Sequence, residues 1–121
     1  MDTGKVKRTL SEHADYIRAM LLLDANRLVS GSDDKTIKIW NVEDGTVKRT
    51  LTGHTHYVNA LKGLDNGDLV SGSEDGTIKI WDVGTGLVKK EMDVDTRINS
   101  FEMLQNGDLV SASEESIIIW D

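Results

Sequence analysis

The feature that most constrains the fold is a segment of about a dozen residues that occurs three times and ends each time in tryptophan. The three copies read LVSGSDDKTIKIW, LVSGSEDGTIKIW and LVSASEESIIIW, and they end at Trp40, Trp81 and Trp120. The tryptophans are 41 and 39 residues apart. Self-similarity at a period of about 40 residues is the signature of a repeat protein. The chain is therefore predicted to be one continuous unit over residues 1–121, made of repeat units at approximately 1–41, 42–82 and 83–121.

Within each repeat the apolar residues form short alternating runs, which favour strands over helices. Residue pairs that adopt tight hairpin turns separate these runs, such as Asn66-Gly67, Asn106-Gly107 and Asp75-Gly76. In the second repeat the expected strands are Thr46 to Leu51, Tyr57 to Leu61, Asp68 to Ser73 and Thr77 to Asp82. We therefore predict an all-β fold with a four-stranded meander per repeat. A single meander cannot bury both of its faces, so the repeats must stack.

Composition excludes several classes of function. The 121 residues carry a formal net charge of −7, which disfavours nucleic acid as a partner because phosphate contacts need a basic face. The absence of cysteine rules out disulfides, thiolate metal sites and cysteine nucleophiles. No apolar run is long enough for a membrane span or a signal peptide, so we expect no membrane partner and a cytoplasmic location.

The chain resembles the WD-repeat β-propeller family. The residues that carry the resemblance are Gly53-His54, the segment SGSEDGTIKIWD ending at Trp81-Asp82, and the weaker copies Trp40-Asn41 and Trp120-Asp121. In that family each repeat supplies the outermost strand of one blade and the three inner strands of the next blade. The resemblance covers essentially the whole chain.

Histidine, serine and aspartate recur at equal spacing in the first two repeats. The residue types resemble a catalytic triad, but a nucleophile is needed once and not in every blade. The family resemblance instead implies a buried hydrogen-bonded tetrad that includes the strand tryptophan and joins the strands of a blade. The predicted tetrads are His13, Ser30, Asp34 and Trp40, and His54, Ser71, Asp75 and Trp81. Sequence alone leaves open whether Ser32 and Ser73 take the serine positions instead.

The third repeat departs from this pattern. Val94 stands at the histidine position, Glu115 replaces the turn aspartate, and one turn residue is missing. We therefore expect the third blade to lack a tetrad and to be the softest of the three, held by the apolar run from Ile117 to Ile119. The middle residue of that run, Ile118, contributes either to packing or to a partner contact.

The resemblance places interaction positions on the top face of the propeller, near the start of the innermost strand and just before the turn aspartate. These positions are Tyr16, Arg18 and Asp33, then Tyr57, Asn59 and Glu74, then Arg97, Asn99 and Glu114. Tyrosine and arginine often contribute most of the binding energy at interfaces. The alternative interpretation is a solvated rim without a partner.

Three blades are too few for a propeller, which has about four to eight. The five-residue spacing from residue 40 to 45, and from 81 to 86, would persist if residue 121 were followed by residue 1. The expected outer strand Lys5 to Leu10 and the last blade, Arg97 to Asp121, each expose an edge. We therefore expect head-to-tail closure between chains, with a six-bladed homodimer favoured and a nine-bladed homotrimer as the alternative.

These observations favour a non-enzymatic scaffold that binds a protein or peptide, without cofactor or metal. The alternative is a self-assembling structural or engineered repeat protein whose only partner is itself. A hydrolase or sugar-binding site is a distant third hypothesis, based only on the triad-like residue types. His54 and His56 could share one face of a strand as metal ligands, but no third ligand is spaced to help them.

Overall fold

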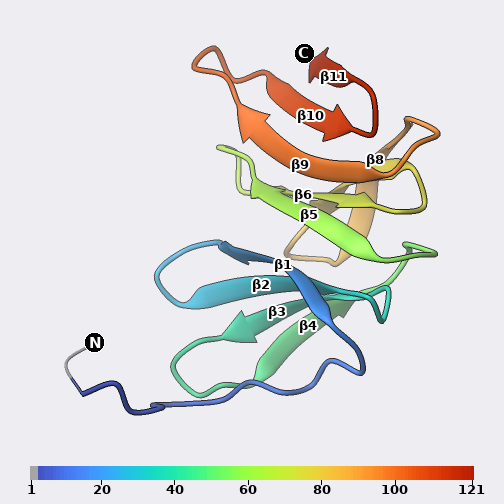
Figure 1. Ribbon diagram of the computed structural model, residues 1–121. Coiled ribbons are helices and arrows are strands. Elements are labelled where there is room, and N and C mark those ends of the chain that lie inside the picture. Colours follow the sequence, from blue (N-terminus) through green and yellow to red (C-terminus); the bar gives the residue numbers. More distant parts are fainter. Residues whose placement is uncertain (1–2) are drawn as a thin grey trace.

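The computed structural model describes residues 3–121, and within this range the protein consists of three antiparallel β-sheets stacked on one another (Figure 1). Blade 1 contains β1 (Ile17–Leu22), β2 (Arg27–Ser32), β3 (Ile37–Asn41) and β4 (Val47–Leu51). Blade 2 contains β5 (Val58–Gly63), β6 (Leu69–Ser73), β7 (Thr77–Asp82) and β8 (Leu87–Asp93). Blade 3 contains β9 (Ile98–Met103), β10 (Leu109–Ser113) and β11 (Ile117–Trp120). The described residues include no helix, so the predicted all-β class is confirmed.

The sheets are offset from the sequence repeats by one strand. The outermost strand of blade 1, β4, comes from the unit that supplies the three inner strands of blade 2. In the same way β8, from the third unit, completes blade 2. The family resemblance implies this arrangement, in which each repeat unit supplies one strand to the blade before it. Neighbouring repeat units are therefore joined by the hydrogen bonds of the shared sheet as well as by the chain itself.

The hairpin turns form where the sequence places residues that tolerate positive φ. Gly67 and Gly107 have φ angles of 92° and 94°, and Gly76 has 83°. Lys35 occupies the place of Gly76 in blade 1 and adopts a φ of 74°. Positive φ is strained for a lysine, so this turn is set by the surrounding hydrogen bonds and not by the residue's own preference.

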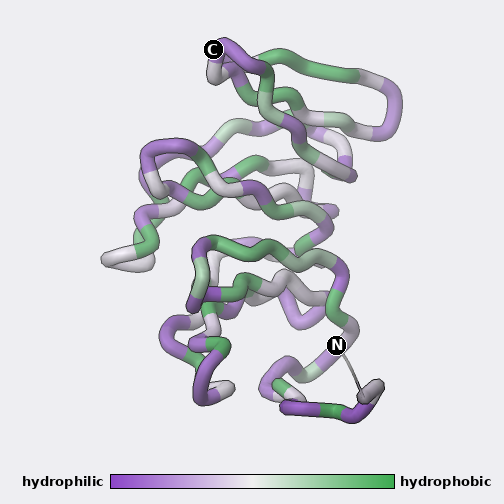
Figure 2. Tube along the Cα trace, turned by 90° about the vertical axis from the view of Figure 1, so that its left-hand side faces the viewer, coloured by the Kyte–Doolittle hydropathy of each residue, from purple (hydrophilic) through white to green (hydrophobic). Residues whose placement is uncertain are grey.

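The hydrophobic core lies between the blades. One buried cluster joins blades 1 and 2 and contains Val29, Ile37, Ile39, Leu51, Val58, Leu69 and Trp81. A second joins blades 2 and 3 and contains Ala60, Val70, Ile78, Ile98, Phe101 and Leu109. Hydrophobic residues follow the strands while the turns are mostly hydrophilic (Figure 2). Each blade is therefore stabilised mainly by its neighbours, as expected for units that cannot bury both faces alone.

The N-terminal segment differs from its sequence-based prediction. Lys5 to Leu10, expected as an outer strand, forms no strand in the single chain. It runs past the β3–β4 turn of blade 1, where Arg8 Nη1 donates a hydrogen bond to the Val42 carbonyl at 3.2 Å. The prediction fails for the isolated chain because a strand needs a ladder partner, and no described residue pairs with this segment. The first two residues of the repeat unit 1–41 lie outside the described residues.

Candidate functional site

The four predicted tetrad residues of blade 2 form a continuous chain of hydrogen bonds. Trp81 Nε1 donates to Ser71 Oγ at 2.8 Å, and Ser71 Oγ lies 2.6 Å from His54 Nε2. His54 Nδ1 lies 2.9 Å from the Asp75 carboxylate, which can only accept, so Nδ1 carries the proton. The serine hydroxyl then donates to Nε2. The chain ties β6 and β7 to the loop that precedes β5.

Blade 1 repeats this arrangement almost atom for atom. Trp40 Nε1 donates to Ser30 Oγ at 2.8 Å, Ser30 Oγ lies 2.6 Å from His13 Nε2, and His13 Nδ1 lies 2.8 Å from Asp34. The serines of these chains are therefore Ser30 and Ser71. The alternative serine of blade 2, Ser73, instead donates to the Tyr57 carbonyl at 2.7 Å.

Electrostatics favour one protonation state in the blade 2 tetrad. Burial lowers the pKa of His54, more than the neighbouring Asp75 carboxylate raises it, so the imidazole is neutral. Burial alone would raise the pKa of Asp75, but hydrogen bonds from Thr77 and His54 outweigh it and lower that pKa to about 2. The pair is therefore a neutral donor beside an ionised acceptor across the neutral pH range.

The position of Ser71 bears on the hydrolase hypothesis. Its side chain is 0% exposed, and its hydroxyl is already occupied by both Trp81 and His54. A nucleophile must reach its substrate, and its base must be free to take the proton. The geometry therefore favours a strand-linking role for this chain of hydrogen bonds.

Blade 3 retains one bond of the tetrad. Trp120 Nε1 still donates to Ser111 Oγ at 2.9 Å. Val94 stands at the histidine position and packs against the cluster between blades 2 and 3. Glu115 is exposed at the shortened turn. A chain from tryptophan to carboxylate does not form in this blade.

The nine predicted top-face residues gather where the loops before the inner strands meet the turns after β2, β6 and β10. Backbone bonds hold these segments together: the Asp33 N–H donates to the Tyr16 carbonyl at 2.8 Å, and the Glu74 N–H donates to the Tyr57 carbonyl at 2.9 Å. In blades 1 and 2 the residue before the inner strand therefore lies beside the acidic residue of the turn. We call these nine residues the top face.

Arg18 connects the top face of blade 1 with that of blade 2. Arg18 forms a two-point ion pair with Asp33, in which Nη2 lies 2.9 Å from Oδ2. Its guanidinium also lies over the Tyr57 ring, 5.1 Å from the centroid. The ion pair raises the pKa of Arg18 and lowers that of Asp33. Tyr16, by contrast, is 74% exposed.

The same pattern continues between blades 2 and 3. Asn59 Nδ2 donates to Glu74 at 3.0 Å and to the Ile98 carbonyl at 3.2 Å. Arg97 lies between two carboxylates, 3.8 Å from Glu74 and 3.7 Å from Glu114. Asn99 is exposed on the same face. The structure thus brings all nine predicted residues to one edge of the three sheets. Arg18, Asn59 and Asn99, together with the inner strands that carry them, line a shallow hollow of about 310 Å³.

No metal site is found in residues 3–121, where no group of three His, Asp or Glu side chains could hold an ion. His56 instead packs edge-on against the Tyr57 ring, with centroids 4.4 Å apart. Within the same range, no helix has the length and apolar character of a membrane span.

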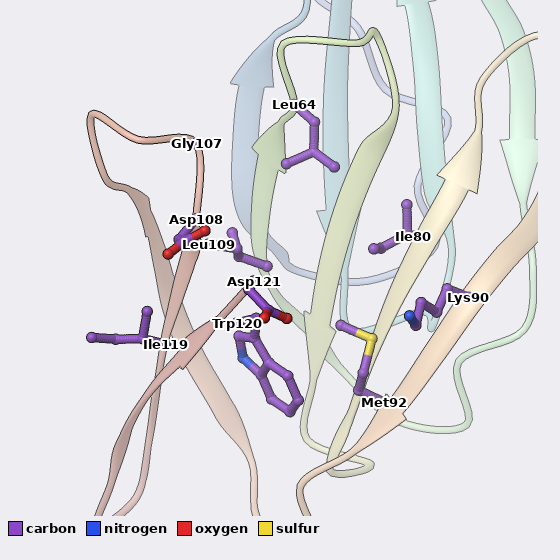
Figure 3. A pocket seen from close by; sticks show the side chains of 10 residues that line it. All are labelled: Leu64, Ile80, Lys90, Met92, Gly107, Asp108, Leu109, Ile119, Trp120 and Asp121. Carbon is purple, nitrogen blue, oxygen red and sulfur yellow. The ribbon is translucent and has the colours of Figure 1, made fainter.

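A groove that the sequence analysis missed lies between blades 2 and 3. It has a volume of about 660 Å³ and is lined by apolar side chains that include Leu64, Ile80, Met92, Leu109 and Trp120 (Figure 3). Val83, which follows the Trp81-Asp82 pair, packs against the corresponding cluster between blades 1 and 2. The repeat phase is the signal that could have revealed the groove.

Comparisons with known proteins agree with this geometry. The sequence profile described as "WD domain, G-beta repeat" matches residues 4–41 and 44–82, well over half of the chain. The chain therefore belongs to the WD-repeat family, and its fold is that of a β-propeller segment.

Among solved structures, the chain is similar to the WD40 β-propeller domain of Doa1, with a TM-score of 0.88 and 34% identity over 95% of this chain. It spans 40% of that chain. Among curated proteins, it is similar to the ribosome biogenesis protein YTM1 of Eremothecium gossypii, 37% identical over 41 residues. That match covers 34% of this chain and 9% of YTM1.

Proposed function

We propose that this protein is a non-enzymatic propeller scaffold that binds a protein or peptide through its top face. The observation that supports the proposal is the convergence of the same three positions from each repeat at one edge of the sheets. Arg18 is held in place by Asp33 and Tyr57, so little side-chain freedom is lost when a ligand binds. Tyr16 and Arg97 extend from the same edge and offer area with a polar end.

Selection from a displayed random-peptide library tests this proposal without a known partner. Peptides selected on the intact chain are titrated against Tyr57→Ala and Arg97→Ala. We expect each change to weaken binding by roughly tenfold or more, as for residues at the centre of an interface. The matched controls are Lys48→Ala and Lys89→Ala, which lie on the outer strands. Peptides whose affinity responds only to the outer lysines would refute the assignment of the face.

We propose in addition that copies of the chain associate head to tail into a closed ring. The specific observation is a duplicated strand sequence: residues 6–10 read VKRTL, identical to β4 at residues 47–51. In blade 1, β4 pairs with β3, with Leu51 opposite Ile37 and Val47 opposite Trp40. Residues 6–10 have the same sequence, so they could pair with β11 in the way that β4 pairs with β3. The outer edge of β11 pairs with no described residue. A six-bladed dimer is favoured over a nine-bladed trimer.

Sedimentation equilibrium of wild-type protein and of Leu10→Asp tests the association. Leu10 matches Leu51, which is fully buried once β4 is paired, so a charge there should abolish association. Lys7→Asp is the matched control because Lys7 matches the exposed Lys48. We expect twice the chain mass for wild type and the control, and a single chain for Leu10→Asp. A wild-type protein that stays monomeric at high concentration contradicts the proposal.

A further inference from the structure

Exposed apolar side chains collect at the two ends of the stack of blades. At one end, β1 exposes Ile17, Met20 and Leu22. At the other, blade 3 exposes Leu104, Ile117 and Ile119. The side chain of Ile119 extends in the opposite direction from that of Trp120 (Figure 3). Two apolar faces of this kind are typical of surfaces that another protein surface covers.

Two of these residues have equivalents that are fully buried where a neighbouring blade is present. Ile17 pairs with Ser32 in the same register in which Ile98 pairs with Ser113. Yet Ile17 is 53% exposed, whereas Ile98, packed on blade 2, is 0% exposed. On the opposite face of a blade, Ile117 is 75% exposed, whereas its equivalent Ile78 is 0% exposed. The two end faces therefore correspond to the two halves of one blade junction.

The junctions within the chain share a knob-and-socket contact at a glycine. At the junction of blades 1 and 2, Val58 packs onto Gly31, and a Cβ at residue 31 would lie 2.6 Å from Val58 Cγ1. At the junction of blades 2 and 3, Ile98 packs onto Gly72, where a Cβ would overlap Ile98 Cγ2 even more closely. Only the absence of a side chain allows the blades to approach this closely.

The third socket carries a methyl group. In blade 3 the position equivalent to Gly72 is Ala112. Ala112 pairs with Ser100 of β9 in the same register in which Gly72 pairs with Ala60 of β5. We infer that Ala112 fills the socket into which Ile17 of a second copy would insert, and so makes the junction between copies the loosest in the ring. This inference rests on the proposed head-to-tail association. An added methyl in a tightly packed contact forces the neighbour to move, which weakens the contact without abolishing it.

The N-terminal segment also indicates that a second copy covers this face. Arg49 of β4 packs beside Gly86 and donates to the carbonyls of Gly84 and Thr85 of blade 2. Arg8 packs beside Gly45 and donates to Val42 of blade 1 in the corresponding place. The segment thus lies against blade 1 as the outer strand of a preceding blade would. A second copy supplies that blade in the form of its own blade 3.

Removal of the methyl group tests the inference directly. Dissociation constants of wild type and Ala112→Gly are measured by sedimentation over a range of concentrations. We expect Ala112→Gly to associate roughly tenfold more tightly, because the overlap with Ile17 is relieved. Adding Ile17→Ala to Ala112→Gly should remove most of that gain in affinity. In the wild-type background, Ile17→Ala should change the dissociation constant less. The reverse change, Gly72→Ala, should lower the midpoint of thermal unfolding because it obstructs a junction within the chain.

The outcomes separate this inference from the association on which it rests. Wild-type association that is unchanged by Ala112→Gly overturns the role of Ala112 and leaves head-to-tail association standing. A gain in Ala112→Gly that persists with Ile17→Ala overturns the pairing of these two residues. If neither wild type nor Ala112→Gly associates at any concentration, the proposed association fails and the inference falls with it.

Discussion

Blades 2 and 3 have similar second and third strands, LVSGS and IKIW against LVSAS and IIIW, and differ in what surrounds those strands. Both keep the bond between tryptophan and serine, at 2.8 Å for Trp81 and 2.9 Å for Trp120. In blade 2 a histidine and an aspartate extend that bond into a longer chain of hydrogen bonds. Blade 2 also has an outer strand and a neighbouring blade on each face. Blade 3 has one neighbour and three strands among the described residues. The tryptophan–serine bond therefore forms from the strand pairing alone. Trp40 and Trp81, in the two four-stranded blades, are 2% and 1% exposed, whereas Trp120, in the three-stranded blade, is only partly buried.

Truncation of the two tryptophans should give the largest contrast between these blades. Trp81→Ala removes a fully buried side chain and should cost about 3–5 kcal/mol of unfolding free energy. Trp120→Ala removes a side chain that is only partly buried, so we expect roughly half of that cost. Urea denaturation of both variants measures the difference. Equal costs would show that the two blades are packed equally well.

Removal of the blade 2 histidine should have the next largest effect. His54→Ala removes the bond from Ser71 to the histidine and the bond from the histidine to Asp75, and should cost about 1–3 kcal/mol. Val94→Ala at the same position of blade 3 should act through lost packing alone, about 1–2 kcal/mol. Urea denaturation at neutral pH measures both. Negligible effects at both positions would rule out a strand-linking role for the tetrad.

A histidine placed in blade 3 should fail to repair it. Val94→His meets Ser111 but no aspartate, because Glu115 is exposed on a turn one residue shorter. Burying an imidazole with half of its partners should destabilise the chain by about 1–2 kcal/mol. Thermal unfolding followed by circular dichroism gives the sign. A more stable Val94→His variant would show that the missing histidine alone accounts for the weakness of this blade.

Acid should weaken blade 2 through its tetrad. Burial lowers the pKa of His54 in the folded chain. Below about pH 6.5 the unfolded chain therefore binds a proton that the folded chain does not, and the free energy of unfolding decreases as the pH decreases. Asp75, with a pKa lowered to about 2, adds a further loss as the pH falls from about 4 towards 2. Urea midpoints measured from pH 7.5 to 5.5 should fall in wild type and fall less in His54→Ala. An equal slope in the two proteins would contradict the buried neutral state of His54.

The sequence allowed much of the fold to be predicted because its period and turn residues act locally. The spacing of the tryptophans indicated the blades, and pairs such as Asn66-Gly67 indicated the hairpins, since positive φ depends on residue type. The tetrad members could be named from the phase of the repeats. The choice of Ser71 over Ser73 could not, because both face inward from one strand and only the three-dimensional path of β6 separates them.

Features that depend on a neighbour were beyond the reach of sequence analysis. The phase of the repeats placed an outer strand at Lys5 to Leu10, yet pairing requires an edge that the single chain does not bring to it. The apolar run in β11 was expected to hold blade 3, but Ile117 and Ile119 are exposed and Ile118 is only partly buried. The contact of Arg18 with Tyr57 joins two blades and has no signature within one repeat. Burial of this kind is decided by the assembly of blades and not by the pattern within one of them.

Amide hydrogen exchange as a function of protein concentration tests most directly the claim that blade 3 is completed by a second copy. We predict that the amides of β10 and β11 exchange much faster than those of β6 and β7 in dilute protein, and slow as concentration rises, while blade 2 stays constant. The Leu10→Asp variant should keep fast exchange in blade 3 at every concentration. Equal protection of the two blades, or a difference that does not change with concentration, would contradict the claim.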